Sequence, residues 1–85
     1  MAFPGLEGVQ RRRRELIDEL VRARKQSGLS QTDVAARMGT SQSAVARLES
    51  GELDARLSTL ERYAAALDTT VAYAVASRRT QEPPR

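Results

Sequence analysis

Residues 31–51 read QTDVAARMGTSQSAVARLESG, and this stretch decides the fold. It holds two short segments with helical character, and only residues 39–41 separate them. Ser30 and Ser41 stand where each segment begins, and a serine there can accept a hydrogen bond from a free backbone N–H of the first turn. A glycine follows each segment and supplies the left-handed residue that ends a helix. We therefore expect two short helices, the second over residues 42–50, joined by a tight turn.

Two short helices joined by a glycine-containing turn form the arrangement that lays its second helix in the major groove of DNA. The side chains fit this arrangement. Ala35 is small where the two helices must cross closely, while Met38, Val45 and Leu48 can fill the core between them. The opposite side of the helix over 42–50 is polar and free to meet a ligand.

The flanking sequence predicts two more helices. A first helix is expected from about 9 to 27, because its apolar residues recur on one stripe and Gly28 follows it. That stripe consists of Leu16, Ile17, Leu20 and Val21. After a loop over 53–57, Ser58 and Glu61 match a capping box, which predicts a fourth helix ending at about Leu67.

The pattern changes period after the fourth helix. Val71, Tyr73 and Val75 alternate with alanines, which favours a β-strand over residues 70–77. A single strand leaves its backbone donors unpaired, and the simplest partner is the same strand of a second copy, with these three residues as dimerisation contacts. The alternative is that 70–77 continues as helix.

The composition excludes several classes of protein. The 85 residues include no Cys and no His, which removes disulfides, thiol nucleophiles, imidazole bases and the common zinc or iron ligand sets. No glycine-rich phosphate loop is present either. The sequence therefore predicts no enzyme activity, no cofactor and no metal. Because no long apolar stretch occurs, it also predicts a soluble, cytoplasmic protein without a membrane partner.

Positive charge is concentrated near the N-terminus. The formal net charge is +3, and half of the 14 basic residues fall within 11–25. A clustered basic patch is typical of a protein that binds a polyanion. The run Arg11–Arg14 has two interpretations that the sequence leaves open. It contacts backbone phosphates, or it is a solvated run partly paired with Glu15, Asp18 and Glu19.

The stretch from about Leu16 to Leu67 resembles the Cro/repressor-like helix-turn-helix family, also called the XRE family. The residues that carry the resemblance are Gly28-Leu29-Ser30-Gln31, Ala35, Gly39-Thr40-Ser41, Val45 and Leu48-Glu49-Ser50-Gly51. The resemblance implies a mostly α, lambda-repressor-like bundle of four to five helices, to which we add the C-terminal β-strand that pairs across a dimer. It also implies an internal ion pair between Arg24 and Glu49.

This organisation divides the chain into four parts. They are a flexible N-terminal arm over 1–8, the helix-turn-helix domain over 9–69, the dimerisation strand over 70–77 and a disordered tail over 78–85.

Side-chain chemistry assigns the DNA contacts. Gln42 can pair with adenine, Arg47 with guanine, Ser43 with a groove edge or phosphate, and Ala46 can offer its methyl group to thymine. Gln31, at the start of the preceding helix, can meet a phosphate, and the resemblance implies that it also steadies Gln42. Further phosphate contacts are expected from Thr40, Ser41 and Ser50.

These observations predict a dimeric regulator, most simply a repressor, that binds double-stranded DNA at a palindromic operator. A narrower hypothesis comes from a resemblance to HigA-type antitoxins, which bind a toxin protein and repress their own operon. The alternative is a protein-interaction module that keeps the helix-turn-helix fold without specific DNA binding, because a fold alone does not fix a function.

Overall fold

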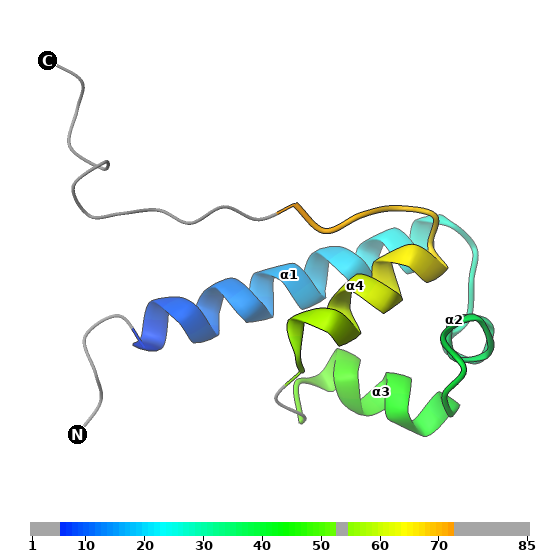
Figure 1. Cartoon of the computed structure of the whole chain (residues 1–85), viewed down its shortest axis with the longest axis horizontal. Coiled ribbons are helices and arrows are strands. Elements are labelled where there is room, and N and C mark those ends of the chain that lie inside the picture. The colour runs from blue at the N-terminus through cyan, green and yellow to red at the C-terminus, as the bar shows by residue number, and fades with distance from the viewer. Residues whose placement is uncertain (1–5, 53–54, 73–85) are drawn as a thin grey trace, which may run out of the picture.

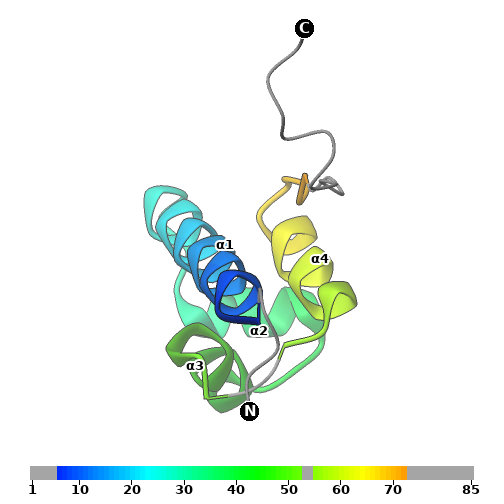
Figure 2. The same cartoon turned by 90° about the vertical axis from the view of Figure 1, so that its left-hand side faces the viewer.

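The structure, a computed structural model, describes residues 6–52 and 55–72. It contains four helices: α1 (Leu6–Gln26), α2 (Gln31–Met38), α3 (Gln42–Ser50) and α4 (Leu57–Ala66). Helices α1 and α4 lie side by side (Figure 1), and α2 and α3 cover one side of that pair (Figure 2). The described residues form no strand. None of the four helices has the length and apolar character that crossing a membrane requires.

The ends of α2 and α3 confirm the predicted caps. The Ser30 hydroxyl accepts from the Asp33 N–H at 3.0 Å, and the Asp33 carboxylate accepts from the Ser30 N–H at 2.8 Å. The Ser41 hydroxyl accepts from a first-turn N–H at 3.1 Å. Gly39 and Gly51 end the two helices at φ 71° and 80°, a conformation that costs glycine nothing and strains other residues.

The core lies where the four helices meet and is built from small and medium-sized side chains. Its buried apolar members are Ile17, Leu20, Val34, Ala35, Met38, Val45, Leu48, Ala55, Leu60, Tyr63, Ala64 and Ala66. Leu16 and Val21, the other members of the predicted stripe on α1, pack against its edge. Ala35 keeps only 3% of its surface exposed, as a close crossing of helices requires.

Two arginines connect the C-terminal ends of α2 and α4 through hydrogen bonds. Arg37 of α2 donates to the Ala66 carbonyl at the end of α4, at 2.8 Å. Arg62 of α4 donates in return to the Met38 carbonyl at the end of α2. The last carbonyls of a helix lack intrahelical partners and carry partial negative charge, so each guanidinium satisfies a group that needs a donor.

Helix α4 begins earlier than predicted, and the expected Ser58–Glu61 capping box is wrong. The N-cap is Arg56, whose extended backbone (φ −72°, ψ 151°) makes no side-chain cap. Its carbonyl instead accepts from the N–H groups of Thr59 and Leu60 at 3.0 and 3.1 Å. This end of the helix lies at the surface, where water can satisfy free N–H groups, so a serine cap is dispensable.

Helix α1 also begins earlier than predicted. It starts at Leu6 rather than at about 9, so residues 6–8 of the predicted arm are helical. Gly8 costs a helix about 1 kcal/mol relative to alanine, which a helix of 21 residues absorbs. The first turns of α1 project beyond the other helices (Figure 1), and Val9 is 57% exposed. Residues 1–5 lie outside the described part of the chain.

The predicted strand over 70–77 falls largely outside the described residues, as do Tyr73, Val75 and the predicted tail. Thr70 to Ala72 form no strand in the described chain, and Val71 packs half-buried against the core of its own chain. The strand and its pairing across a dimer therefore stay a prediction.

The crossing of α2 can be tested with two neighbouring alanines. Ala35 is buried and Ala36 is exposed on the same helix. Because overpacking a core forces neighbours to move, we expect Ala35→Leu to lower the free energy of unfolding by about 1–3 kcal/mol. Ala36→Leu should change it by less than about 0.5 kcal/mol. Urea unfolding measures both, and equal effects would contradict the close crossing.

Candidate nucleic-acid interface

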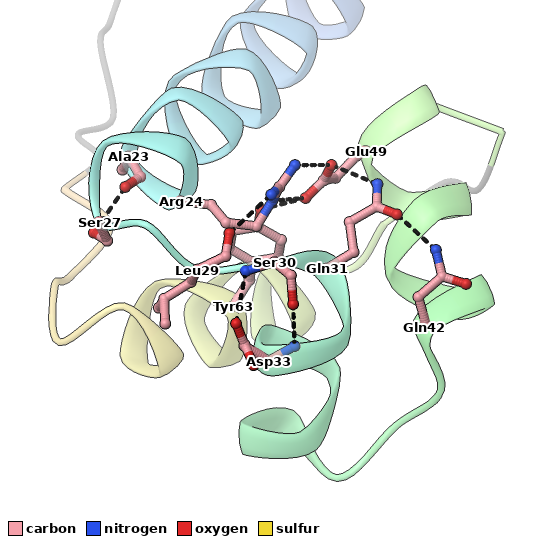
Figure 3. Close-up of polar contacts among 10 residues, drawn as sticks. All are labelled: Ala23, Arg24, Ser27, Leu29, Ser30, Gln31, Asp33, Gln42, Glu49 and Tyr63. Atoms are coloured by element: carbon pink, nitrogen blue, oxygen red, sulfur yellow. Dashed lines mark hydrogen bonds and ion pairs between the residues drawn. The ribbon is translucent and has the colours of Figure 1, made fainter.

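A buried ion pair joins α1 to the end of α3. Arg24 Nε lies 2.7 Å from Glu49 Oε2, and Arg24 Nη2 lies 3.0 Å from Glu49 Oε1 (Figure 3). The two side chains are only 10% and 8% exposed. Arg24 also donates to the Leu29 carbonyl at 3.0 Å, in the loop between α1 and α2. The planar guanidinium thus connects α1, the loop after it and α3, and it binds the carboxylate in a bidentate geometry.

Two further donors reach the same carboxylate from the other helices. Gln31 Nε2 of α2 donates to Glu49 Oε1 at 2.9 Å, and the Tyr63 hydroxyl of α4 donates to Glu49 Oε2 at 2.5 Å. We call these four residues the Glu49 cluster: Arg24, Gln31, Glu49 and Tyr63 (Figure 3). All four helices contribute to it. No polar side-chain atom buried in the described chain lacks a hydrogen-bond partner.

The electrostatics of the cluster favour an ionised Glu49. Burial opposes ionisation of this carboxyl, but hydrogen bonds from Arg24, Tyr63 and Gln31 outweigh burial and hold its pKa below the ordinary value. The hydrogen bond to Glu49 likewise raises the pKa of Arg24, against the opposing effect of burial. Burial and the neighbouring carboxylate raise the pKa of Tyr63, so its hydroxyl stays protonated and donates.

The cluster continues outward to the first residue of α3. Gln42 Nε2 donates to Gln31 Oε1 at 2.6 Å (Figure 3). Gln31 is half-buried and Gln42 is exposed, so the chain of hydrogen bonds runs from the core to the surface. Gln42 therefore stands at the N-terminal end of α3 with its amide held by its neighbour.

The remaining predicted contact residues lie on or beside the exposed side of α3. Ser43 and Arg47 are exposed and Ala46 is half-buried. The hydroxyls of Ser41 and Ser43 lie 3.2 Å apart, and both Ser41 and Thr40 are exposed in the turn. At the far end, the exposed Ser50 donates back to the Arg47 carbonyl at 3.0 Å. This face offers hydroxyl, amide and guanidinium groups, which are the groups that meet base edges and phosphates.

The basic run of the sequence approaches the same surface from α1. The guanidinium of Arg14 lies against Gly51, where a Cβ would stand 2.5 Å from its Nη2. Arg14 is exposed and sits beside the C-terminal end of α3. Arg12 instead pairs with Glu15 at 3.2 Å on the exposed surface of α1. Only part of the run thus adjoins the polar face.

The sequence alone could not predict that Tyr63 and Arg14 lie at this site. Tyr63 is 14 residues from Glu49 along the chain, and its place on the buried side of α4 gives no reason to expect its hydroxyl at a carboxylate. Arg14 stands in a run of identical residues with nothing to distinguish it.

Two short helices at a tight turn, with a polar face on the second, define a protein of the helix-turn-helix class, a class of DNA-binding domains. Comparison with protein families agrees: the helix-turn-helix family model matches residues 20–73. The chain therefore belongs to the helix-turn-helix family, of the Cro/repressor-like (XRE) type that the sequence predicted.

Among curated proteins, the chain is similar to Antitoxin HigA1 of two Mycobacterium tuberculosis strains, CDC 1551 / Oshkosh and ATCC 25618 / H37Rv. It is 48% identical to each over 68 residues, which cover 79% of this chain. The match covers 45% of each relative, so the chain spans a little under half the length of these proteins. No solved structure gave a significant match.

The Glu49 cluster can be tested through Tyr63. We expect Tyr63→Phe to lower the free energy of unfolding by about 1.5–3 kcal/mol near neutral pH, because it removes a hydrogen bond to a buried charge. Because the pKa of Glu49 is lowered by folding, its ionisation stabilises the fold above the ordinary value of about 4.3. That stabilisation disappears as the pH falls through the folded pKa, so the cost of Tyr63→Phe should shrink in acid.

Urea unfolding between about pH 7 and about pH 3 measures this dependence. Ser58→Ala is the matched control, since it removes an exposed hydroxyl from the same helix. It should change the free energy of unfolding by less than about 0.5 kcal/mol throughout the range. If Tyr63→Phe lowers the free energy of unfolding equally at both ends of this pH range, the Tyr63 hydroxyl does not donate to an ionised Glu49.

Proposed function

We propose that this protein is a sequence-specific DNA-binding transcriptional regulator that acts as a repressor and binds double-stranded DNA in the cytoplasm. The observation that carries the proposal is the exposed polar face of α3, whose first residue is held by the Glu49 cluster. A side chain fixed before binding loses less conformational entropy when it meets a base, and it meets that base in one orientation.

In the proposed complex α3 lies in the major groove. Gln42 hydrogen-bonds an adenine edge and Arg47 a guanine edge, while Ser43 and Ala46 contact neighbouring bases. The N-terminal end of α2 and the turn before α3 meet backbone phosphates, which fix the position of the protein on the duplex. The proposed phosphate contacts are Gln31, Thr40, Ser41 and Ser50.

The regulator is proposed to act as a dimer on a palindromic operator. Two α3 helices would read half-sites about 34 Å apart on one face of the duplex. The predicted strand over 70–77, with Val71, Tyr73 and Val75, would pair across the dimer and set that separation. The bundle of a single chain is small and buries a small core, which favours a fold completed by a second copy.

The names of the two curated relatives support a narrower proposal: this protein is an antitoxin that binds a toxin protein and represses its own operon. The test is co-expression with the product of the neighbouring gene. A stable complex of the two chains, together with binding to the DNA upstream of their genes, supports the antitoxin function. If the product of the neighbouring gene does not bind, the result contradicts the antitoxin function and favours a repressor that acts without a toxin partner.

Operator reading can be tested with two substitutions on α3. We expect Gln42→Ala and Arg47→Ala each to weaken binding to the DNA upstream of the gene by about 5- to 150-fold. Each variant should also lose the preference for one particular base pair, the one that the missing side chain contacts. Both side chains are exposed, so the fold should persist. Fluorescence anisotropy across a salt series measures affinity, and light scattering measures the mass of the bound species.

Arg22→Ala is the control, because it removes an equal charge from an exposed position on α1. It should leave the base preference unchanged. Binding of the unaltered protein to random DNA as tightly as to the upstream sequence would contradict operator reading. It would favour the alternative, a protein-interaction module with this fold.

The contact between Arg14 and Gly51 supports a backbone contact at the far end of α3. We expect Arg14→Ala to weaken binding to all DNA sequences about equally and to reduce the salt slope by about 1, the effect of losing one phosphate contact. Arg12→Ala should reduce the slope less, since Arg12 is paired with Glu15. The same salt series measures both, and equal slopes for Arg14→Ala and the unaltered protein would leave Arg14 outside the interface.

A further inference from the structure

We propose that Glu49 is a positioning residue that sets the base preference of Gln42 without touching DNA. It would act through Gln31, in a chain of hydrogen bonds from Glu49 to Gln31 to Gln42 that we call the amide relay (Figure 3). The inference rests on the proposed function, because it concerns how α3 reads a base.

The donor and acceptor chemistry of the relay permits one arrangement. An ionised carboxylate only accepts hydrogen bonds, so Gln31 must turn its Nε2 toward Glu49. Its Oε1 is then directed at Gln42, and because an amide oxygen only accepts, Gln42 must offer its own Nε2. The orientation of both amides thus follows from the charge state of Glu49. A side chain at 49 that could also donate would leave both amides free to turn over.

Two groups in the core keep Glu49 an acceptor. Arg24 occupies both carboxylate oxygens, and the Tyr63 hydroxyl donates its only proton to Oε2. The Glu49 side chain is 8% exposed, so little water competes for the bond to Gln31. The end of the relay, in contrast, is exposed at Gln42.

A fixed amide presents its groups to the groove in one order. Gln42 keeps one free N–H on Nε2, next to Gln31, and its Oε1 on the other side. Adenine offers N7 as acceptor and the N6 amino group as donor, and reversing the A·T pair to T·A reverses this order across the groove. A locked amide therefore distinguishes A·T from T·A, whereas an amide that can turn over accepts both orders more evenly.

The experiment measures the affinity of the full chain for its upstream DNA and for duplexes with the base pair at Gln42 replaced. We expect the unaltered protein to prefer A·T over T·A there by about tenfold or more. Gln31→Ala and Glu49→Gln should each reduce the preference to about threefold or less. Glu19→Gln, the same chemical change at an exposed position of α1, should leave it unchanged.

A merely structural role of Glu49 predicts a different pattern. Partial unfolding would weaken binding at every base pair by the same factor, whereas the relay changes the preference at one. In a Gln42→Ala background, Glu49→Gln should have no further effect on that preference. Gln31→Ala leaves the Arg24–Glu49 pair in place, so it tests the relay even where Glu49→Gln fails to fold. Thermal unfolding of each variant separates the two effects.

The outcomes separate this inference from the proposed function. A Gln42→Ala variant with an unchanged base preference would overturn the proposed contact itself, and the relay with it. A preference that vanishes in Gln42→Ala but survives intact in Glu49→Gln would overturn the role of Glu49, and one that also survives in Gln31→Ala would overturn the whole relay.

Discussion

The carboxylate of Glu49 lies where all four helices meet, and the rest of the structure depends on its partners. Arg24, Gln31 and Tyr63 approach it from α1, α2 and α4. Removing one member of a buried ion pair strands a charge in the core, at a cost of about 3–5 kcal/mol. The pair need not be more stable than an apolar replacement. Its consequence is geometric, because a planar guanidinium and a carboxylate fit together in few orientations.

This constraint matters because the helices have little else to define their packing. Helices of 8–10 residues, such as α2, α3 and α4, are not stable alone in water. Their buried side chains include several alanines, which allow close approach but specify relative position poorly. The directional bonds supply what the core lacks: the Glu49 cluster at one place, and the exchange of Arg37 and Arg62 between the ends of α2 and α4 at another.

Local chemistry explains which elements the sequence could predict. Ser30 and Ser41 act as caps on the helices that follow them, and Gly39 and Gly51 end those helices, so α2 and α3 were predictable residue by residue. Ser58 had the same local signal but lies inside α4, because backbone bonds to Arg56 begin that helix earlier. The pairing of Arg24 with Glu49 was expected from a family resemblance. The addition of Tyr63 required the three-dimensional packing of α4, which no local pattern encodes.

The amide relay divides the polar face of α3 into two kinds of position. Ser43 and Arg47 are exposed and make no hydrogen bond to the Glu49 cluster in the described chain, so replacing them changes the groups that this face presents and leaves the junction of the four helices intact. Gln42 is different, because its amide completes a hydrogen-bond sequence that begins at a buried charge. A change at Gln42 leaves Gln31 without its partner, and in the proposed relay a change at Glu49 reaches the surface through both amides. In the proposed relay, the buried charge that joins the four helices also sets the base preference at the N-terminal end of α3.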